Sequence, residues 1–120
     1  MARLIEKPTK IQACGTKEKK IKEFIGNVNS KTDAVSIAKM ESPQGWEEPG
    51  QTPEFDEYTI VLKGILKVET EHNSYEVKAG QAIIVVQHEW VRYSTPYQGG
   101  AEYIAVCLPA FSPNLVNRDR

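Results

Sequence analysis

Short stretches of β-type residues, separated by turn residues, are the feature that most constrains how this chain folds. The stretches are four to seven residues long, and turn residues such as Gly64, Asn73 and Gly80 stand between them. Many short strands at regular spacing are typical of an antiparallel sandwich or barrel. The predicted strands are residues 10–14, 34–40, 58–63, 65–71, 74–78, 81–86, 91–94 and 101–107.

The segment 17–26 departs from this pattern and predicts a short α-helix. Thr16 is a suitable N-cap, and Gly26 is a suitable C-terminal stop. Three apolar residues between them recur at helical spacing, and these are Ile21, Phe24 and Ile25. We therefore expect an N-terminal extension over residues 1–33, whose helix packs on a barrel formed by residues 34–120.

Charge and composition argue against several classes of partner. The formal net charge is −1, which gives no general attraction to nucleic acid or to anionic membranes. Apolar runs such as residues 82–86 are short, whereas a membrane-spanning helix needs roughly 20 residues. The N-terminus lacks the apolar region of a secretory signal, and Cys14 and Cys107 fit free thiols in a reducing compartment. We expect a cytoplasmic protein without nucleic-acid or membrane partners.

Two motifs in the expected barrel resemble those of the cupin family. The first is an acid, Glu57, followed by six residues and then Gly64. The second begins at Gly80 and runs through five residues to Val86, where the family usually has proline. The resemblance covers about residues 34–113. It implies a single all-β cupin (jelly-roll) barrel, to which the predicted helix is added, and it implies a homodimer because small cupins commonly pair through their sheets.

The histidines that bind metal in typical cupins are missing from these motifs. In typical cupins a His-x-His pair precedes the acid, and the corresponding residues here are Gln51 and Pro53, or Gly50 and Thr52. The later histidine of the family corresponds to Val91. Only Glu57 remains of the usual four ligands. We therefore predict no resident metal. A divalent transition metal held by Gln51, Glu57 and His88 is the alternative.

Among cupins, the sequence is most similar to the ethanolamine-utilisation type. The likeness rests on short sequence motifs, namely Asp56-Glu57, Val91 and Ser94-Thr95-Pro96. The resemblance implies a role in a small-metabolite pathway, and acyl-phosphate chemistry if the protein is an enzyme.

Glu57 is the first candidate for chemistry. If the barrel register holds, its carboxyl points inward, and burial would raise its pKa to a value that suits a general acid or base. The alternative is a structural carboxylate that forms an ion pair, for instance with Arg92.

Tyr93 is a second candidate catalytic residue, and five residues are candidate pocket residues: Trp46, Gln51, His88, Val91 and Tyr103. Strand alternation places Tyr93 on the same face as Val91, so its hydroxyl either binds a polar ligand group or belongs to the core. Trp46 stands in the irregular segment 41–55 and either caps the pocket or fixes that loop to the barrel. Tyr103 is also a candidate, although strand alternation does not decide which face of the sheet its side chain lies on.

These observations leave three functions open. The expected one is a small-molecule-binding cupin without a metal. The second is an isomerase, a lyase or an acyl-phosphate enzyme that uses Glu57, with Tyr93 or His88 assisting. The third is a metal-dependent cupin with an unusual ligand set.

Overall fold

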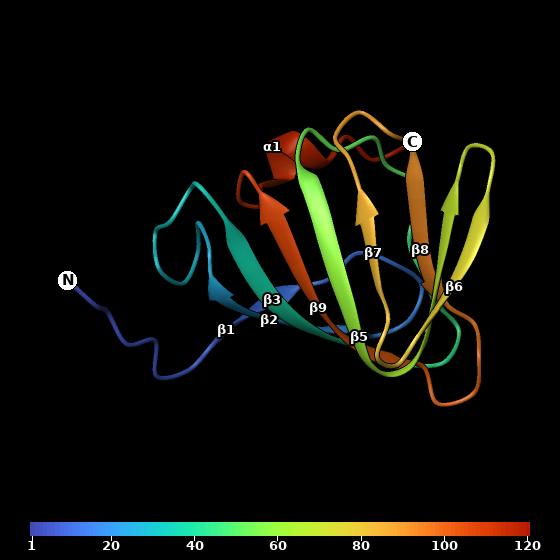
Figure 1. Cartoon of the computed structure of the whole chain (residues 1–120), viewed down its shortest axis with the longest axis horizontal. Coiled ribbons are helices and arrows are strands. Elements are labelled where there is room, and N and C mark those ends of the chain that lie inside the picture. The colour runs from blue at the N-terminus through green and yellow to red at the C-terminus, as the bar shows by residue number, and fades with distance from the viewer.

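Two antiparallel sheets curl around a common interior in the computed structural model, which describes residues 1–120 (Figure 1). One sheet contains β1, β2, β3, β9, the first half of β5, and β7. The other contains β6, the second half of β5, β8 and β4. The bounds are β1 Thr9–Gln12, β2 Lys20–Ile25, β3 Ser36–Ser42, β4 Trp46–Glu47, β5 Asp56–Thr70, β6 Ser74–Lys78, β7 Ala82–Val85, β8 Val91–Thr95, β9 Ala101–Leu108 and α1 Pro113–Val116.

β5 joins the two sheets because it is long enough to belong to both. Its first half pairs with β7 and β9, and its second half pairs with β6 and β8. The change occurs around Gly64, which has a φ of 75° and follows a register shift between Val61 and Lys63. A positive φ favours glycine at this position. The sequence predicted two strands interrupted at Gly64, and the structure has one bent strand.

The core lies between the two sheets, where alternate residues of each strand point inward. Buried side chains of both sheets form one cluster, whose members are Trp46, Val61, Leu66, Val68, Val77, Val85, Val91, Tyr93, Ala101 and Tyr103. A smaller cluster of Phe55, Cys107 and Val116 lies under α1. The all-β barrel is therefore confirmed, with each sheet contributing one face to the interior.

The predicted helix over residues 17–26 is wrong, because this segment contains strand β2. Ile21 and Glu23 alternate along β2 and face inward, a period-2 pattern that the helical spacing of the apolar residues concealed. β2 also pairs with β1 on one side and β3 on the other. This pairing outweighs local helix propensity. The only helix is α1, near the C-terminus.

β1 and β2 extend the same sheet as the strands that follow them, and the boundary at residue 33 stays a prediction. The chain before β1 runs away from the body of the molecule (Figure 1). No helix here combines the length and apolar character that crossing a bilayer requires.

Candidate functional site

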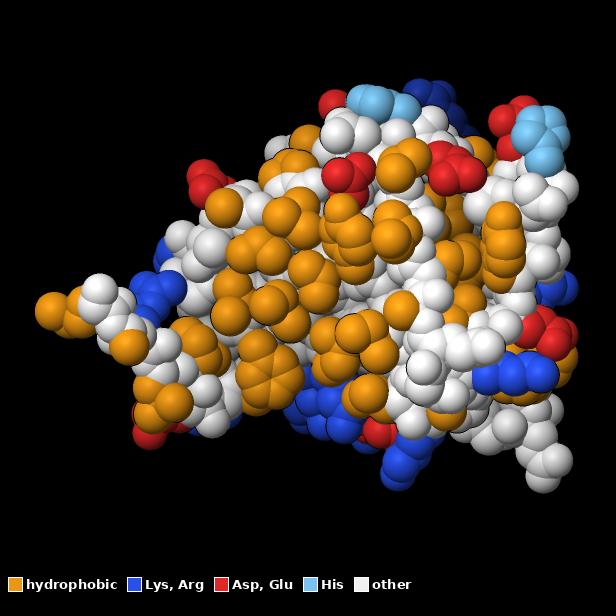
Figure 2. Space-filling model, viewed as in Figure 1, with side chains coloured by type: hydrophobic (Ala, Val, Ile, Leu, Met, Phe, Trp, Pro, Cys, Tyr) orange, Lys and Arg blue, Asp and Glu red, His pale blue; other side chains and the backbone are white.

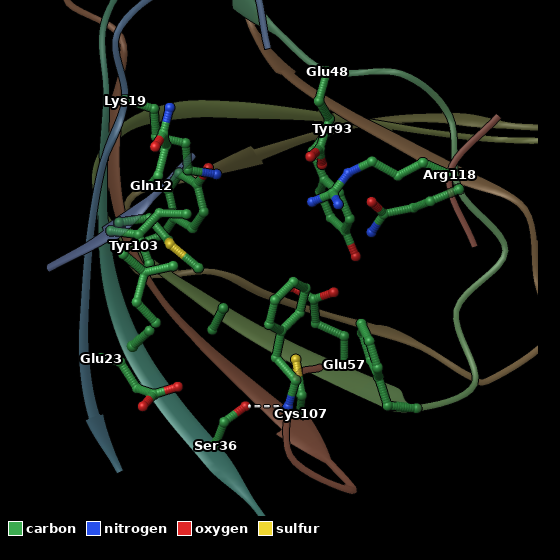
Figure 3. A pocket seen from close by; sticks show the side chains of 18 residues that line it. Gln12, Lys19, Glu23, Ser36, Glu48, Glu57, Tyr93, Tyr103, Cys107 and Arg118 are labelled. Atoms are coloured by element: carbon green, nitrogen blue, oxygen red, sulfur yellow. Dashed lines mark hydrogen bonds between the residues drawn. The ribbon is translucent and has the colours of Figure 1, made fainter. Parts of the chain in front are cut away.

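A cavity of about 90 Å³ lies inside the barrel, against the inner face of the larger sheet. Residues from β1, β2, β3, β5, β8 and β9 line it, together with the loop before β5 and the C-terminal tail (Figure 3). The 18 lining residues are Ile11, Gln12, Lys19, Ile21, Glu23, Ser36, Ala38, Met40, Glu48, Gln51, Phe55, Glu57, Tyr93, Tyr103, Ala105, Cys107, Phe111 and Arg118. The cavity thus combines apolar walls with several charged groups.

Glu57 and Tyr93 approach one another across this cavity from β5 and β8 (Figure 3). Burial, reinforced by the negative charge of Glu48, raises the pKa of Glu57 to about 7, while Lys19 opposes the shift. Burial and the charge of Glu57 also raise the pKa of Tyr93. Glu57 can therefore accept or donate a proton near neutral pH, whereas Tyr93 remains a neutral phenol.

Three polar atoms of the cavity residues are buried without a hydrogen-bond partner. They are Gln51 Oε1, the Tyr93 hydroxyl and Arg118 Nε. Gln51 and Tyr93 are each only 4% exposed, so bulk solvent does not satisfy these groups. An unsatisfied buried polar group costs about 1–3 kcal/mol, and these three atoms are free to form hydrogen bonds with a molecule that enters the cavity.

Two cations line the cavity, Arg118 and Lys19, and Lys19 forms cation–π contacts with aromatic rings. Its Nζ lies 3.8 Å from the centre of the Trp46 ring and 5.1 Å from that of Tyr103. The Tyr103 hydroxyl pairs with Ser42 Oγ at 2.9 Å. Tyr103 therefore supports the cavity wall while its own polar atom is already satisfied.

Three predicted pocket residues, Trp46, Val91 and the exposed His88, do not line the cavity, and the first two belong to the core instead. Trp46 is 1% exposed, and its indole N–H donates to the Cys14 carbonyl at 3.0 Å, so it fixes its loop to the chain before β2. Val91 is completely buried in the core cluster and does not line the cavity. Gln51, Glu57, Tyr93 and Tyr103 do line it.

The suggested ion pair between Glu57 and Arg92 is also wrong. Arg92 lies on the outward face of β8, and its guanidinium contacts Glu69 Oε1 of β5 at 3.0 Å. Glu57 therefore has no cationic partner of this kind.

The metal set Gln51, Glu57 and His88 does not converge. His88 is exposed, in a turn where its φ is 70° and its backbone N–H donates to the Pro53 carbonyl. Only Gln51 and Glu57 reach the cavity, which contains no imidazole. No group of three or more His, Cys, Asp or Glu side chains is placed to hold a metal ion. The donor set present does not fit the tight transition-metal site of typical cupins.

Sequence reasoning missed four charged lining residues: Lys19, Glu23, Glu48 and Arg118. Alternation within β2 was the one available signal for Glu23, whose Oε2 accepts hydrogen bonds from the backbone N–H groups of Val28 and Asn29. The other three lie outside regular strands, and long-range packing alone brings them to the cavity.

Comparison with solved structures identifies the fold. The polyketide cyclase RemF from Streptomyces resistomycificus superposes with a TM-score of 0.74 at 20% identity, over 98% of this chain and 84% of RemF. A Salmonella typhimurium protein named for ethanolamine utilization, EutQ, gives a TM-score of 0.68 at 16% identity, over 87% of this chain and 97% of EutQ. The fold is that of a cupin. At sequence identities this low, the superpositions show a shared fold and nothing about function.

Sequence comparison adds one relative. No protein-family model matches this chain. A Myxococcus xanthus protein named endoribonuclease YbeY is 42% identical over 101 residues, which cover 84% of this chain. The chain spans about a third of that protein's length, 34%.

Proposed function

We propose that this protein is a cytoplasmic small-molecule-binding cupin that works without the usual histidine-bound metal, in a metabolic role similar to that named for EutQ. The observation that carries the proposal is the set of three buried, unpartnered polar atoms on Gln51, Tyr93 and Arg118 around one cavity. Apolar walls with a few convergent polar groups are the usual form of a small-molecule site.

A thermal-shift screen of small metabolites, followed by titration of each hit, tests this proposal. Replacing Tyr93 with Phe removes one unpartnered hydroxyl from the cavity, and we expect each hit to bind about tenfold more weakly. Tyr75→Phe is the matched control, because Tyr75 is exposed on β6 and does not line the cavity. Equal loss of affinity in both variants, or no loss in either, would contradict binding at this cavity.

Acid–base catalysis in the same cavity is the second candidate. It is supported by the carboxyl of Glu57, whose pKa of about 7 makes both protonation states available at neutral pH. The candidate reactions are an isomerisation, a lyase step or acyl-phosphate chemistry. Glu57→Gln keeps the side-chain size but removes the group that transfers a proton. If Glu57 is an acid–base catalyst, turnover of a bound substrate should fall at least about 100-fold in this variant while binding persists. Unchanged turnover in this variant would exclude the acid–base role.

We also propose a homodimer that forms through the outer face of the larger sheet. Apolar side chains run across paired strands in two rows, Ile25–Ile37–Val106–Tyr58–Ile84 and Ile104–Ile60–Ala82. Figure 2 presents this face as a broad apolar area over β3, β9, β5 and β7. Ile60 is 51% exposed and Ile84 63% exposed. An apolar area of this kind marks a protein interface, and a second copy of the same sheet is its natural complement.

We assign the endoribonuclease activity named for the Myxococcus xanthus relative to the part of that protein that this chain does not match. The formal net charge of −1 offers no general attraction to RNA. Cleavage of RNA by this chain, abolished by Glu57→Gln, would overturn that assignment.

A further inference from the structure

We propose that the ligand is a small carboxylic acid carrying a neighbouring hydroxyl or amide N–H, and that Arg118 recognises its carboxylate. In this arrangement the Tyr93 hydroxyl donates to the same carboxylate, and Gln51 Oε1 accepts from the neighbouring donor. The inference rests on the proposed binding function and specifies its ligand class.

The C-terminal tail holds Arg118 at the cavity from both sides. Asn117 Nδ2 donates to the Thr52 carbonyl at 3.0 Å and to Glu54 Oε2 at 2.9 Å. On the other side, the Asp119 backbone N–H donates to the Gly50 carbonyl, and its carboxylate accepts from the Trp90 indole at 2.8 Å. Because the residues before and after it are tied to the outer loops, the side chain of Arg118 is directed into the cavity (Figure 3).

The charge of Arg118 has no ion-pair partner within the protein. None of the five ion pairs of the structure involves it, and its buried Nε has no hydrogen-bond acceptor. The other cavity cation, Lys19, lies on the Trp46 ring, and its charge also acts on Glu48 and Glu57. Arg118 is half-buried and its Nε has no acceptor, so one hydrogen bond of the guanidinium is unmade, and a carboxylate offers the acceptor geometry that suits it.

Three carboxyl groups also line the cavity that Arg118 enters. Burial raises the pKa of Glu48 above its ordinary value, although Lys19 and Arg118 oppose the shift. The pKa of Glu57 is about 7, so it carries a proton in a large share of molecules at neutral pH. Glu23, the third acid of the cavity wall, is already satisfied by backbone N–H groups. An entering carboxylate therefore meets the cation of Arg118, a Glu57 that is partly protonated, and a Glu23 whose carboxylate is already held by backbone donors.

The remaining contacts of the ligand follow from the chemistry of the unpartnered atoms. An amide oxygen such as Gln51 Oε1 only accepts hydrogen bonds, so the ligand must bring a donor to it. The Tyr93 hydroxyl is able to donate, which suits a carboxylate oxygen. Phe55, Phe111 and Met40 on the walls leave an apolar surface for a short hydrocarbon body.

Titration calorimetry with paired probes tests the inference on the full chain. The acids are lactate and 2-hydroxybenzoate, and each is compared with its own primary amide, which keeps the shape and removes the charge. We expect at least one acid to bind about tenfold or more tightly than its amide. In Arg118→Gln this preference is lost, whereas in Arg118→Lys, which keeps the charge, most of it remains. Arg120→Gln is the control, because Arg120 is exposed in the same tail and should bind as the natural protein does.

Three outcomes would overturn the inference. One is an amide that binds as tightly as its acid, and another is an acid preference that survives in Arg118→Gln. The third is no binding by either acid at about 10 mM, a concentration that detects even weak complexes. In each case the proposed function survives if an uncharged or cationic metabolite from the thermal-shift screen loses affinity in Tyr93→Phe. If no metabolite binds at all, both proposals fail together.

Discussion

At the scale of single residues, the position of Glu57 at the start of β5 places a carboxyl where solvent does not fully reach it. The groups that face it are Glu48, Lys19, Tyr93 and Cys107. The pKa of the Cys107 thiol is raised by burial, so it stays protonated and adds no charge. The desolvation of Glu57 is therefore only partly offset by Lys19.

This environment predicts a pH dependence of stability. The pKa of Glu57 is about 7 in the folded protein and 4.5 ordinarily, so between these values the folded state binds more protons than the unfolded state. The free energy of unfolding should therefore fall as pH rises from about 4.5 to 7, by at most about 3 kcal/mol from this residue. Glu57→Gln should be more stable than the natural protein at pH 8 and similar to it at pH 5, as measured by urea unfolding.

Glu71→Gln is the control for this experiment, because Glu71 is exposed beside the β5–β6 turn. Glu48 shifts in the same direction, so some pH dependence should remain after Glu57 is replaced. An unchanged difference in unfolding free energy between pH 5 and pH 8 in Glu57→Gln would show that Glu57 does not carry the raised pKa.

The candidate site was partly predictable at this scale. Motif register placed Glu57 and Gln51, and strand alternation placed Tyr93, at positions that line the cavity, whereas alternation left the side of Tyr103 open. Arg118 was not predictable, because hydrogen bonds to a loop more than sixty residues away hold its tail in place.

At the scale of elements, β5 depends on Gly64 to pass from one sheet to the other. A Cβ at this position would lie 2.0 Å from the Gly100 carbonyl oxygen, and the φ of 75° is unfavourable for other residues. We predict that Gly64→Ala lowers the free energy of unfolding by about 3 kcal/mol.

Chemical denaturation of Gly64→Ala beside Gly80→Ala provides the comparison. Gly80 also has a positive φ, 87°, but its added Cβ would meet no atom within 4 Å. The difference between the two variants therefore measures the close approach at Gly64. Equal destabilisation would mean that backbone strain alone, and not the contact with Gly100, fixes the bend.

Elements were predictable where their local pattern and their pairing agree. The strand over residues 74–78 was located correctly, because turn residues mark both ends and β5 pairs along it. β2 was mistaken for a helix, because Ile21, Phe24 and Ile25 have helical spacing and a register shift between Glu23 and Ile25 interrupts the alternation expected of a strand. Only its pairing with β1 and β3 decides between the two, and pairing is not visible in a local window.

At the scale of the whole molecule, the outer apolar rows predict self-association. Ile60→Lys places a charge in the middle of this face and should convert a dimer into a monomer in sedimentation equilibrium. Tyr75→Lys also charges an exposed apolar residue, but on β6 and outside the rows, and should stay dimeric. A natural protein that sediments as a monomer, or an Ile60→Lys variant that remains a dimer, would rule out this interface.

The cavity and the outer face lie on opposite sides of the larger sheet, so a dimer through the outer face leaves the interior free for a ligand. We propose that this interior binds a small organic molecule. A protein-observed NMR titration of the full chain with the metabolites found by thermal shift tests this binding. We expect amide shift changes concentrated at the cavity residues, including Gln51, Tyr93 and Arg118. Changes confined to residues outside the cavity, or none with any metabolite, would contradict it.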